Sequence, residues 1–174
     1  MKVRIALIAL LLPTLAYARP QNAPRTTGFH SEFVANLDEV QAKLVELAEI
    51  TPADKYSWRP AKDVRSISEV YMHVAGFNYF LASYLGTPAP TPTRDLEKSV
   101  TRKSEVLVEL RKSFDHLRAA AARADLEKQV KMFNSNTTTH RGVMMTALSH
   151  IHEHLGQSIA YARMNGVTPP WSRQ

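Results

Sequence analysis

The sequence contains no cysteine among its 174 residues. This absence excludes disulfide bonds, thiolate metal sites, covalent attachment of a c-type haem and a lipid-modified cysteine at a cleavage site. Beyond residue 18, the chain also lacks any apolar run of the roughly 20 residues that a membrane-spanning helix needs. Basic residues are scattered and do not form a stripe interleaved with aromatic residues, so we expect no nucleic-acid partner.

The N-terminus has the pattern of an export signal. Met1-Lys-Val-Arg4 is basic, residues 5–12 are apolar, and Ala16-Tyr-Ala18 forms an Ala-x-Ala cleavage site. We therefore expect a signal peptide at residues 1–18 and a periplasmic or secreted product, with an uncleaved membrane anchor as the alternative. Loss of Lys2 and Arg4 would lower the formal charge from +6 to +4.

The rest of the chain suits one domain. Residues 19–30 are polar and predict a flexible lead-in, and residues 31–174 predict a single folded unit. Within that unit, apolar residues recur at three- and four-residue spacing in four segments, each of which predicts a helix. These segments are residues 31–50, 66–85, 99–124 and 139–165.

The helix ends and connections complete the prediction of fold class. Ser66 and Glu69 have capping-box spacing, and Gly86 and Gly166 stand where two helices should stop. The connections are each about a dozen residues long, so we expect an all-α four-helix bundle with long crossover connections. Residues 128–133 allow a short extended piece, and Trp58 is expected to anchor its loop on the bundle, with stacking on a ligand as the alternative.

The last predicted helix carries a second apolar arc. This arc predicts either contact with another copy of the chain, a homodimer through this helix, or burial of both arcs inside one bundle. Its members are Met144, Leu148, Ile151, Leu155 and Ile159.

The same helix carries a pair of histidines that could share a metal ion. His150 and His154 lie one turn apart on an inward face, whereas His152 points to the opposite side. Seven histidines in this chain give roughly 0.3 such pairs by chance, so packing with a hydrogen bond is the competing interpretation. A third histidine, His73, lies on the inward side of the second helix and needs a partner there: a metal, a carboxylate or a backbone carbonyl.

Together, these histidines predict a metal site in the bundle core. Three neutral imidazoles leave a fourth position open, which is typical of a catalytic site. No Glu-x-x-His pair occurs on two helices, so a di-iron site is not expected. We expect one divalent ion, zinc first, with nickel and iron as alternatives. Gln157 and Tyr161 follow His154 on the same face and could orient a ligand imidazole or line the substrate pocket, with core packing and a satisfied hydroxyl as the alternative for Tyr161.

These residues resemble the DinB/YfiT superfamily. The resemblance rests on a Trp-x-Pro loop at Trp58, the helix start at Ser66 with His73, and His150-x-x-x-His154-Leu-Gly-Gln157 followed by Tyr161. It implies a bundle that holds a divalent metal through His73, His150 and His154. Relatives include transferases and isomerases that use low-molecular-weight thiols, but these thiols are cytosolic, so thiol transfer is not expected of an exported member.

Two classes of function follow. The first is an enzyme in which the metal lowers the pKa of a bound water or thiol and polarises a small-molecule substrate, for hydrolysis or small-group transfer. The second is a non-catalytic metal- or ligand-binding bundle of the periplasm. They differ in whether the fourth coordination position is accessible.

Overall fold

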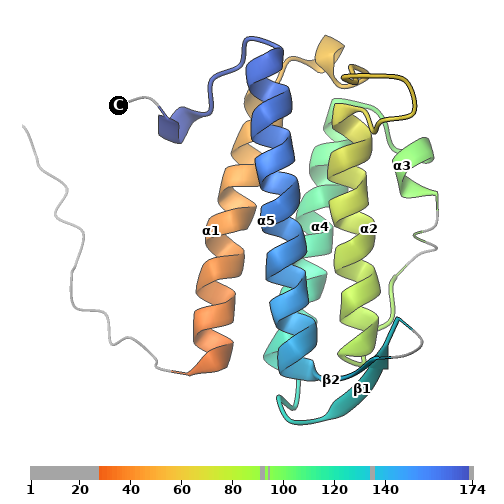
Figure 1. Cartoon of the computed structure of the whole chain (residues 1–174), viewed down its shortest axis with the longest axis vertical. Helices are drawn as coiled ribbons and strands as arrows, with labels where there is room; N and C mark the ends of the chain where they lie inside the picture. The colour runs from red at the N-terminus through yellow and green to blue at the C-terminus, as the bar shows by residue number, and fades with distance from the viewer. Residues whose placement is uncertain (1–27, 91–92, 94, 134–135, 173–174) are drawn as a thin grey trace, which may run out of the picture.

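The computed structural model describes residues 28–90, 93, 95–133 and 136–172, so the predicted signal peptide and most of the predicted lead-in lie outside the described residues. Four long helices form the body of the protein (Figure 1). Among the described residues, no helix combines the length and the apolar character needed to cross a membrane. The long helices are α1 (Phe29–Ile50), α2 (Ile67–Tyr84), α4 (Lys103–Ala122) and α5 (His140–Met164).

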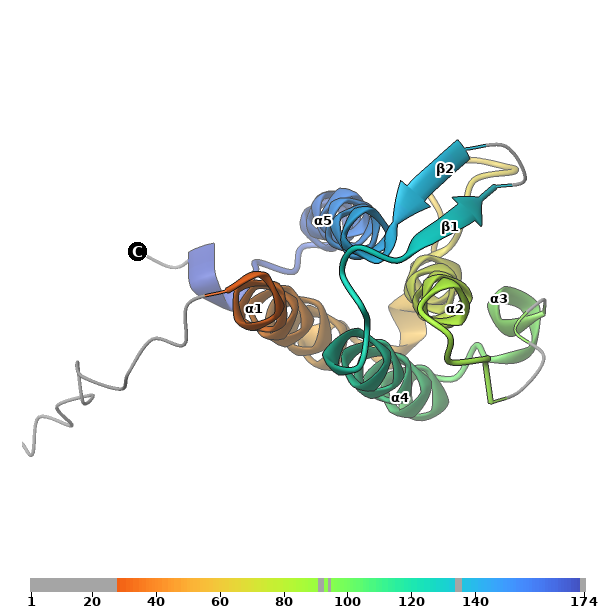
Figure 2. The ribbon, with the colours of Figure 1, turned by 90° about the horizontal axis from the view of Figure 1, so that it is seen from below.

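The four helices form a ring in which each packs on two neighbours. Seen from the end, the order around the ring is α1, α5, α2, α4, so α2 and α5 lie side by side (Figure 2). The connection after α2 returns along the bundle, and α2 and α4 therefore run in the same direction (Figure 1). This all-α four-helix bundle with a long crossover confirms the predicted fold class.

Local signals set the helix ends as predicted. The Ser66 side chain accepts a hydrogen bond from the backbone of Glu69, whose carboxylate accepts from the Ser66 N–H, completing the capping box. The Thr139 hydroxyl accepts from Gly142 N–H at the start of α5. Gly86 and Gly166 follow α2 and α5 with φ of 86° and 75°, a conformation that glycine adopts without a steric penalty.

The predicted apolar stripes form one shared core. The five residues of the α1 stripe are each no more than 2% exposed: Phe33, Leu37, Val40, Leu44 and Leu47. The second arc of α5 also packs inside this one chain, since Met144, Ile151 and Leu155 are buried and the other two members are half-buried. Burial within one bundle therefore accounts for the arc. Homodimerisation through α5 stays a prediction.

The prediction of one helix over residues 99–124 is wrong at the N-terminal end. The chain forms a separate one-turn helix α3 (Leu96–Ser99), Val100 is extended, and α4 begins only at Lys103. Leu96 is buried against the bundle and Glu97 pairs with α2, so tertiary contacts turn the chain here. Two short 3₁₀ turns, η1 (Ala53–Lys55) and η2 (Pro170–Ser172), complete the helical elements.

The connection between α4 and α5 forms a hairpin. Strand β1 (Gln129–Met132) confirms the extended piece predicted at residues 128–133. It pairs antiparallel with β2 (Asn136–Thr139), which was not predicted because turn-forming residues dominate that segment.

Burial of His140 predicts a pH-dependent stability. This side chain is 3% exposed, and neither ring nitrogen has a partner among the described residues. Burial, followed by the charge of Lys128, lowers the pKa of His140 below its ordinary 6.5. The folded form therefore binds fewer protons than the unfolded form as pH falls below 6.5, and stability present above that pH is lost by up to about 1.4 kcal/mol per pH unit.

We expect His140→Leu to reduce this loss. Urea unfolding between pH 7.5 and 5 should show that the free energy of unfolding of the wild type falls relative to that of the variant as the pH decreases. Contributions common to both proteins cancel in the difference. An unchanged difference across this range would contradict the assignment.

Candidate metal centre

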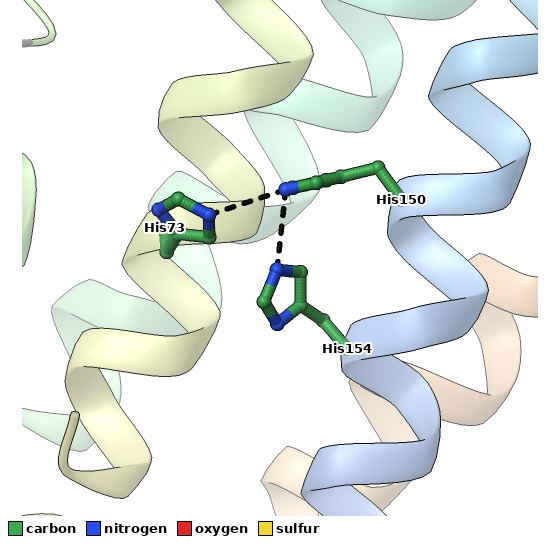
Figure 3. A group of neighbouring side chains, drawn as sticks. All are labelled: His73, His150 and His154. Atoms are coloured by element: carbon green, nitrogen blue, oxygen red, sulfur yellow. Dashed lines mark hydrogen bonds between the residues drawn. The ribbon is translucent and has the colours of Figure 1, made fainter. Parts of the chain in front are cut away.

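Three imidazoles converge between α2 and α5. His73 projects from α2, and His150 and His154 project from successive turns of α5 (Figure 3). His150 Nε2 lies 3.2 Å from His73 Nε2 and 3.1 Å from His154 Nε2. One ligand nitrogen from each ring lies within 4.8 Å of the others, so the group could hold a metal ion.

The spacing suits a small ion with imidazole ligands. Nitrogens bound to tetrahedral zinc at about 2.0–2.1 Å lie about 3.3 Å apart along the edge of the tetrahedron. The two Nε2 contacts of His150 are close to that edge. His154 is buried, whereas His73 and His150 are half-buried, so the group stands at the wall of the bundle.

Glu97 accepts a hydrogen bond from His73 Nδ1, the ring nitrogen that is not directed at the other two histidines. The Nδ1–H of His73 donates to Glu97 Oε1 at 2.8 Å, and Arg65 Nε donates to Glu97 Oε2 at 2.8 Å. Burial would raise the pKa of Glu97, but the hydrogen bonds from Arg65 and His73 outweigh it and leave that pKa lowered. Glu97 is therefore a carboxylate at neutral pH, fixing the ring of His73 as a hydrogen-bond donor at Nδ1.

His154 Nδ1 is hydrogen-bonded to Gln157, which is in turn hydrogen-bonded to Tyr161. His154 Nδ1–H donates to Gln157 Oε1 at 2.8 Å, and the amide nitrogen of Gln157 donates to the Tyr161 hydroxyl at 3.0 Å. Tyr161 is buried, and the Trp58 ring packs edge-on against the Tyr161 ring, with the ring centroids 5.4 Å apart. Trp58 thus anchors its loop as predicted, and does so on a residue linked to the histidines.

The positions of the hydrogen atoms on the imidazole rings favour a bound cation. Because His73 and His154 donate through Nδ1, each presents a bare lone pair at Nε2. His150 Nε2 carries at most one hydrogen, yet it closely approaches both lone pairs. A divalent ion would accept a lone pair from every ring, whereas the hydrogen bonds can satisfy only one contact.

The surroundings favour the neutral form of His73 and His150, which is the form that binds a metal. Burial, then the neighbouring His154, His73 and Arg65, lowers the pKa of His150 to about 3. Burial is also the main cause of the lowered pKa of His73, which the hydrogen bond that His73 donates to Glu97 partly offsets.

The other sequence expectations can be placed around this site. His152 is exposed and bonds to the Leu148 carbonyl at 2.8 Å, away from the cluster as predicted. Glu97 was not predicted as part of the site. Its local signal is limited to an acidic residue beside the apolar Leu96 after a proline-rich stretch.

A polar basin of about 520 Å³ adjoins the site. Its wall includes Glu97 and Gln157, which hold the Nδ1 edges of His73 and His154. The basin therefore lies on the Nδ1 side of these rings and not on the side where the Nε2 atoms converge. Its main charges are paired with each other, Arg59 with Glu69 and Arg65 with Glu97.

Comparisons with known proteins agree with the bundle and its connectivity. The family model described as the DinB superfamily matches residues 36–158. A DinB-like protein from Bacillus cereus has a similar structure, with a TM-score of 0.70 and 18% identity over 79% of this chain and 93% of that one. A DinB-like protein from Bacillus subtilis has a TM-score of 0.64 and 20% identity over the same shares. No curated protein matches the sequence.

Proposed function

Because this chain belongs to the DinB superfamily, we propose that it is a divalent-metal-dependent enzyme in which His73, His150 and His154 hold one ion. Zinc is the first expectation, with nickel and iron as alternatives. The reaction class is hydrolysis or small-group transfer on a small molecule. The observation that carries the proposal is the convergence of three Nε2 atoms between α2 and α5.

In this proposal, some residues of the chain bind the ion and others orient the binding imidazoles. The ion, when bound, would supply Lewis acidity to a substrate carbonyl or leaving group and lower the pKa of a water or thiol. Glu97 and Gln157 hold His73 and His154 in the tautomer that presents Nε2, and Tyr161 holds Gln157 in turn. Within the described residues, the cluster is three histidines without a carboxylate, which leaves coordination room for a substrate.

The alternative is a non-catalytic metal- or ligand-binding protein of the periplasm. It would use the same histidines but keep the remaining coordination position closed to small molecules. Export, with the product periplasmic or secreted, is part of both proposals and rests on the signal pattern of residues 1–18.

Metal content and exchange test the proposal directly. Purified without a histidine tag, the protein should contain about one divalent ion per chain by elemental analysis. A chelator should remove the ion, and added zinc should restore both the ion and any turnover found in a screen of metal-assisted hydrolyses and transfers. A folded protein that neither contains metal nor takes up zinc would refute it, while a tightly bound ion without turnover would favour the alternative.

A further inference from the structure

Three phenylalanine rings form a continuous surface that begins at the candidate metal centre. The Phe77 ring stacks on the His150 imidazole, with centroids 3.8 Å apart and planes inclined by 25°. Phe80 and Phe133 lie 5.7 Å and 6.3 Å from Phe77 and 5.9 Å from each other. We call Phe77, Phe80 and Phe133 the aromatic platform. It extends from an imidazole of the histidine cluster towards the β1–β2 hairpin.

The platform is open to solvent. Phe80 is 38% exposed and Phe133 is 47% exposed, while Phe77 is half-buried beneath them. Single exposed apolar residues are ordinary on protein surfaces, but contiguous ones beside a site indicate a binding surface.

The backbone of Phe133 is held in an unfavourable conformation. Its φ of 52° lies in the left-handed region, which bulky side chains rarely adopt. The Phe133 N–H donates to the Tyr84 hydroxyl of α2 at 3.3 Å, which helps to keep the residue there. Backbone strain of this kind concentrates at ligand-binding positions, where it presents a side chain that a relaxed backbone would turn away.

The size of the platform indicates a small molecule. Since a phenylalanine ring offers about 150–250 Å² of contact area, the exposed parts of Phe80 and Phe133 amount to roughly 150–200 Å². A stable protein interface buries about 800 Å² on each partner. The platform is too small for a second copy of the chain or another protein, but it matches one or two faces of a planar ring.

We propose that the substrate of the metal centre carries an aromatic or similarly flat apolar group that packs on the aromatic platform. This inference rests on the proposed function and specifies its substrate class. The group packs against Phe80 and Phe133 in offset or edge-to-face geometry, while the reacting end of the substrate lies at the histidines. The polar basin does not compete for this group, because its lining is mostly charged and it lies on the Nδ1 side of the rings.

Two hydroxamates test the inference, because they share a metal-binding end and differ only in a methyl or a phenyl group. Calorimetry on the zinc-loaded wild type should show benzohydroxamate binding about tenfold more tightly than acetohydroxamate. In Phe80→Ala/Phe133→Ala the two affinities should come within about threefold, with zinc content and acetohydroxamate affinity unchanged. Val108→Ala/Met145→Ala, which truncates two comparably exposed apolar residues (50% and 53%), should keep the preference.

The possible failures are distinct. Equal affinities in the wild type, or a preference that survives in Phe80→Ala/Phe133→Ala, would overturn the aromatic platform and leave the metal enzyme intact. Absence of zinc, or zinc without binding of either hydroxamate, would overturn the proposed function and this inference with it. Circular dichroism of each variant identifies a loss of binding that comes from unfolding, and Phe80→Leu/Phe133→Leu then replaces the alanine pair.

Discussion

The His73→Ala/His154→Ala variant is expected to contain almost no metal, whereas the wild type should contain about one ion per chain. One imidazole remains in the variant, and a single neutral ligand cannot hold a divalent ion against water. We expect the zinc affinity to fall by at least about 10³-fold in a competition titration with a chromogenic chelator. The same loss should appear in thermal unfolding: zinc at about 1,000 times the wild-type dissociation constant should stabilise the wild type by about 4 kcal/mol and the variant by no more than about 0.4 kcal/mol.

His152→Ala is the matched control for this experiment. His152 has the same chemistry, lies on the same helix between the two proposed ligands, and is exposed with its Nδ1 on the Leu148 carbonyl. Its removal should leave zinc content and zinc-dependent stabilisation at wild-type values. If the double variant retains about one ion, or if His152→Ala loses it, the three-histidine assignment is wrong.

The part of the site that could be predicted from the sequence is the part that local periodicity determines. His150 and His154 are one helical turn apart, and the apolar stripe of α5 shows which side of that turn faces inward. His73 shares its side of α2 with a similar stripe. Because the predicted fold is a helical bundle, the inward faces of two helices could be expected to meet. The structure places α2 and α5 as neighbours in the ring.

The residues of the site that were not predicted from the sequence depend on tertiary contacts that leave no periodic pattern in the sequence. Glu97 reaches His73 from a helix of four residues, 24 positions along the chain. Nothing in the spacing of residues 85–102 shows that this segment turns back onto α2. The continuous helix predicted over residues 99–124 fails for the same reason, because burial of Leu96 and the pairing of Glu97 outweigh helix propensity at Val100. The position of Phe133 was likewise inaccessible, since it depends on the pairing of β1 with β2 and on Tyr84.

Glu97→Ala is expected to weaken zinc binding by about 10–100-fold, although Glu97 is not a ligand. In the variant, His73 loses the acceptor that keeps its hydrogen on Nδ1, so the ring can rotate or take the other tautomer and withdraw its lone pair from the site. Arg65 also loses its carboxylate partner and leaves an uncompensated positive charge beside the ion. Zinc competition titrations and the rate of zinc release to a chelator measure the effect.

Glu97→Gln separates the hydrogen bond from the charge. A glutamine oxygen can still accept from His73 Nδ1–H, but it carries no charge to balance Arg65, so the affinity should fall between those of the wild type and Glu97→Ala. Glu39→Ala, which removes an exposed carboxylate paired with Lys43 on α1, should leave zinc affinity unchanged. The metal-free melting temperatures of all four proteins should be similar, because exposed and half-exposed ion pairs add little to stability. A zinc affinity of Glu97→Ala equal to that of the wild type would mean that packing alone orients His73. A weakening matched by an equal loss of metal-free stability would mean that Glu97 supports α3 and not the metal centre. The expected combination, a weaker site in an equally stable bundle, arises only if the carboxylate acts through the imidazole that it holds.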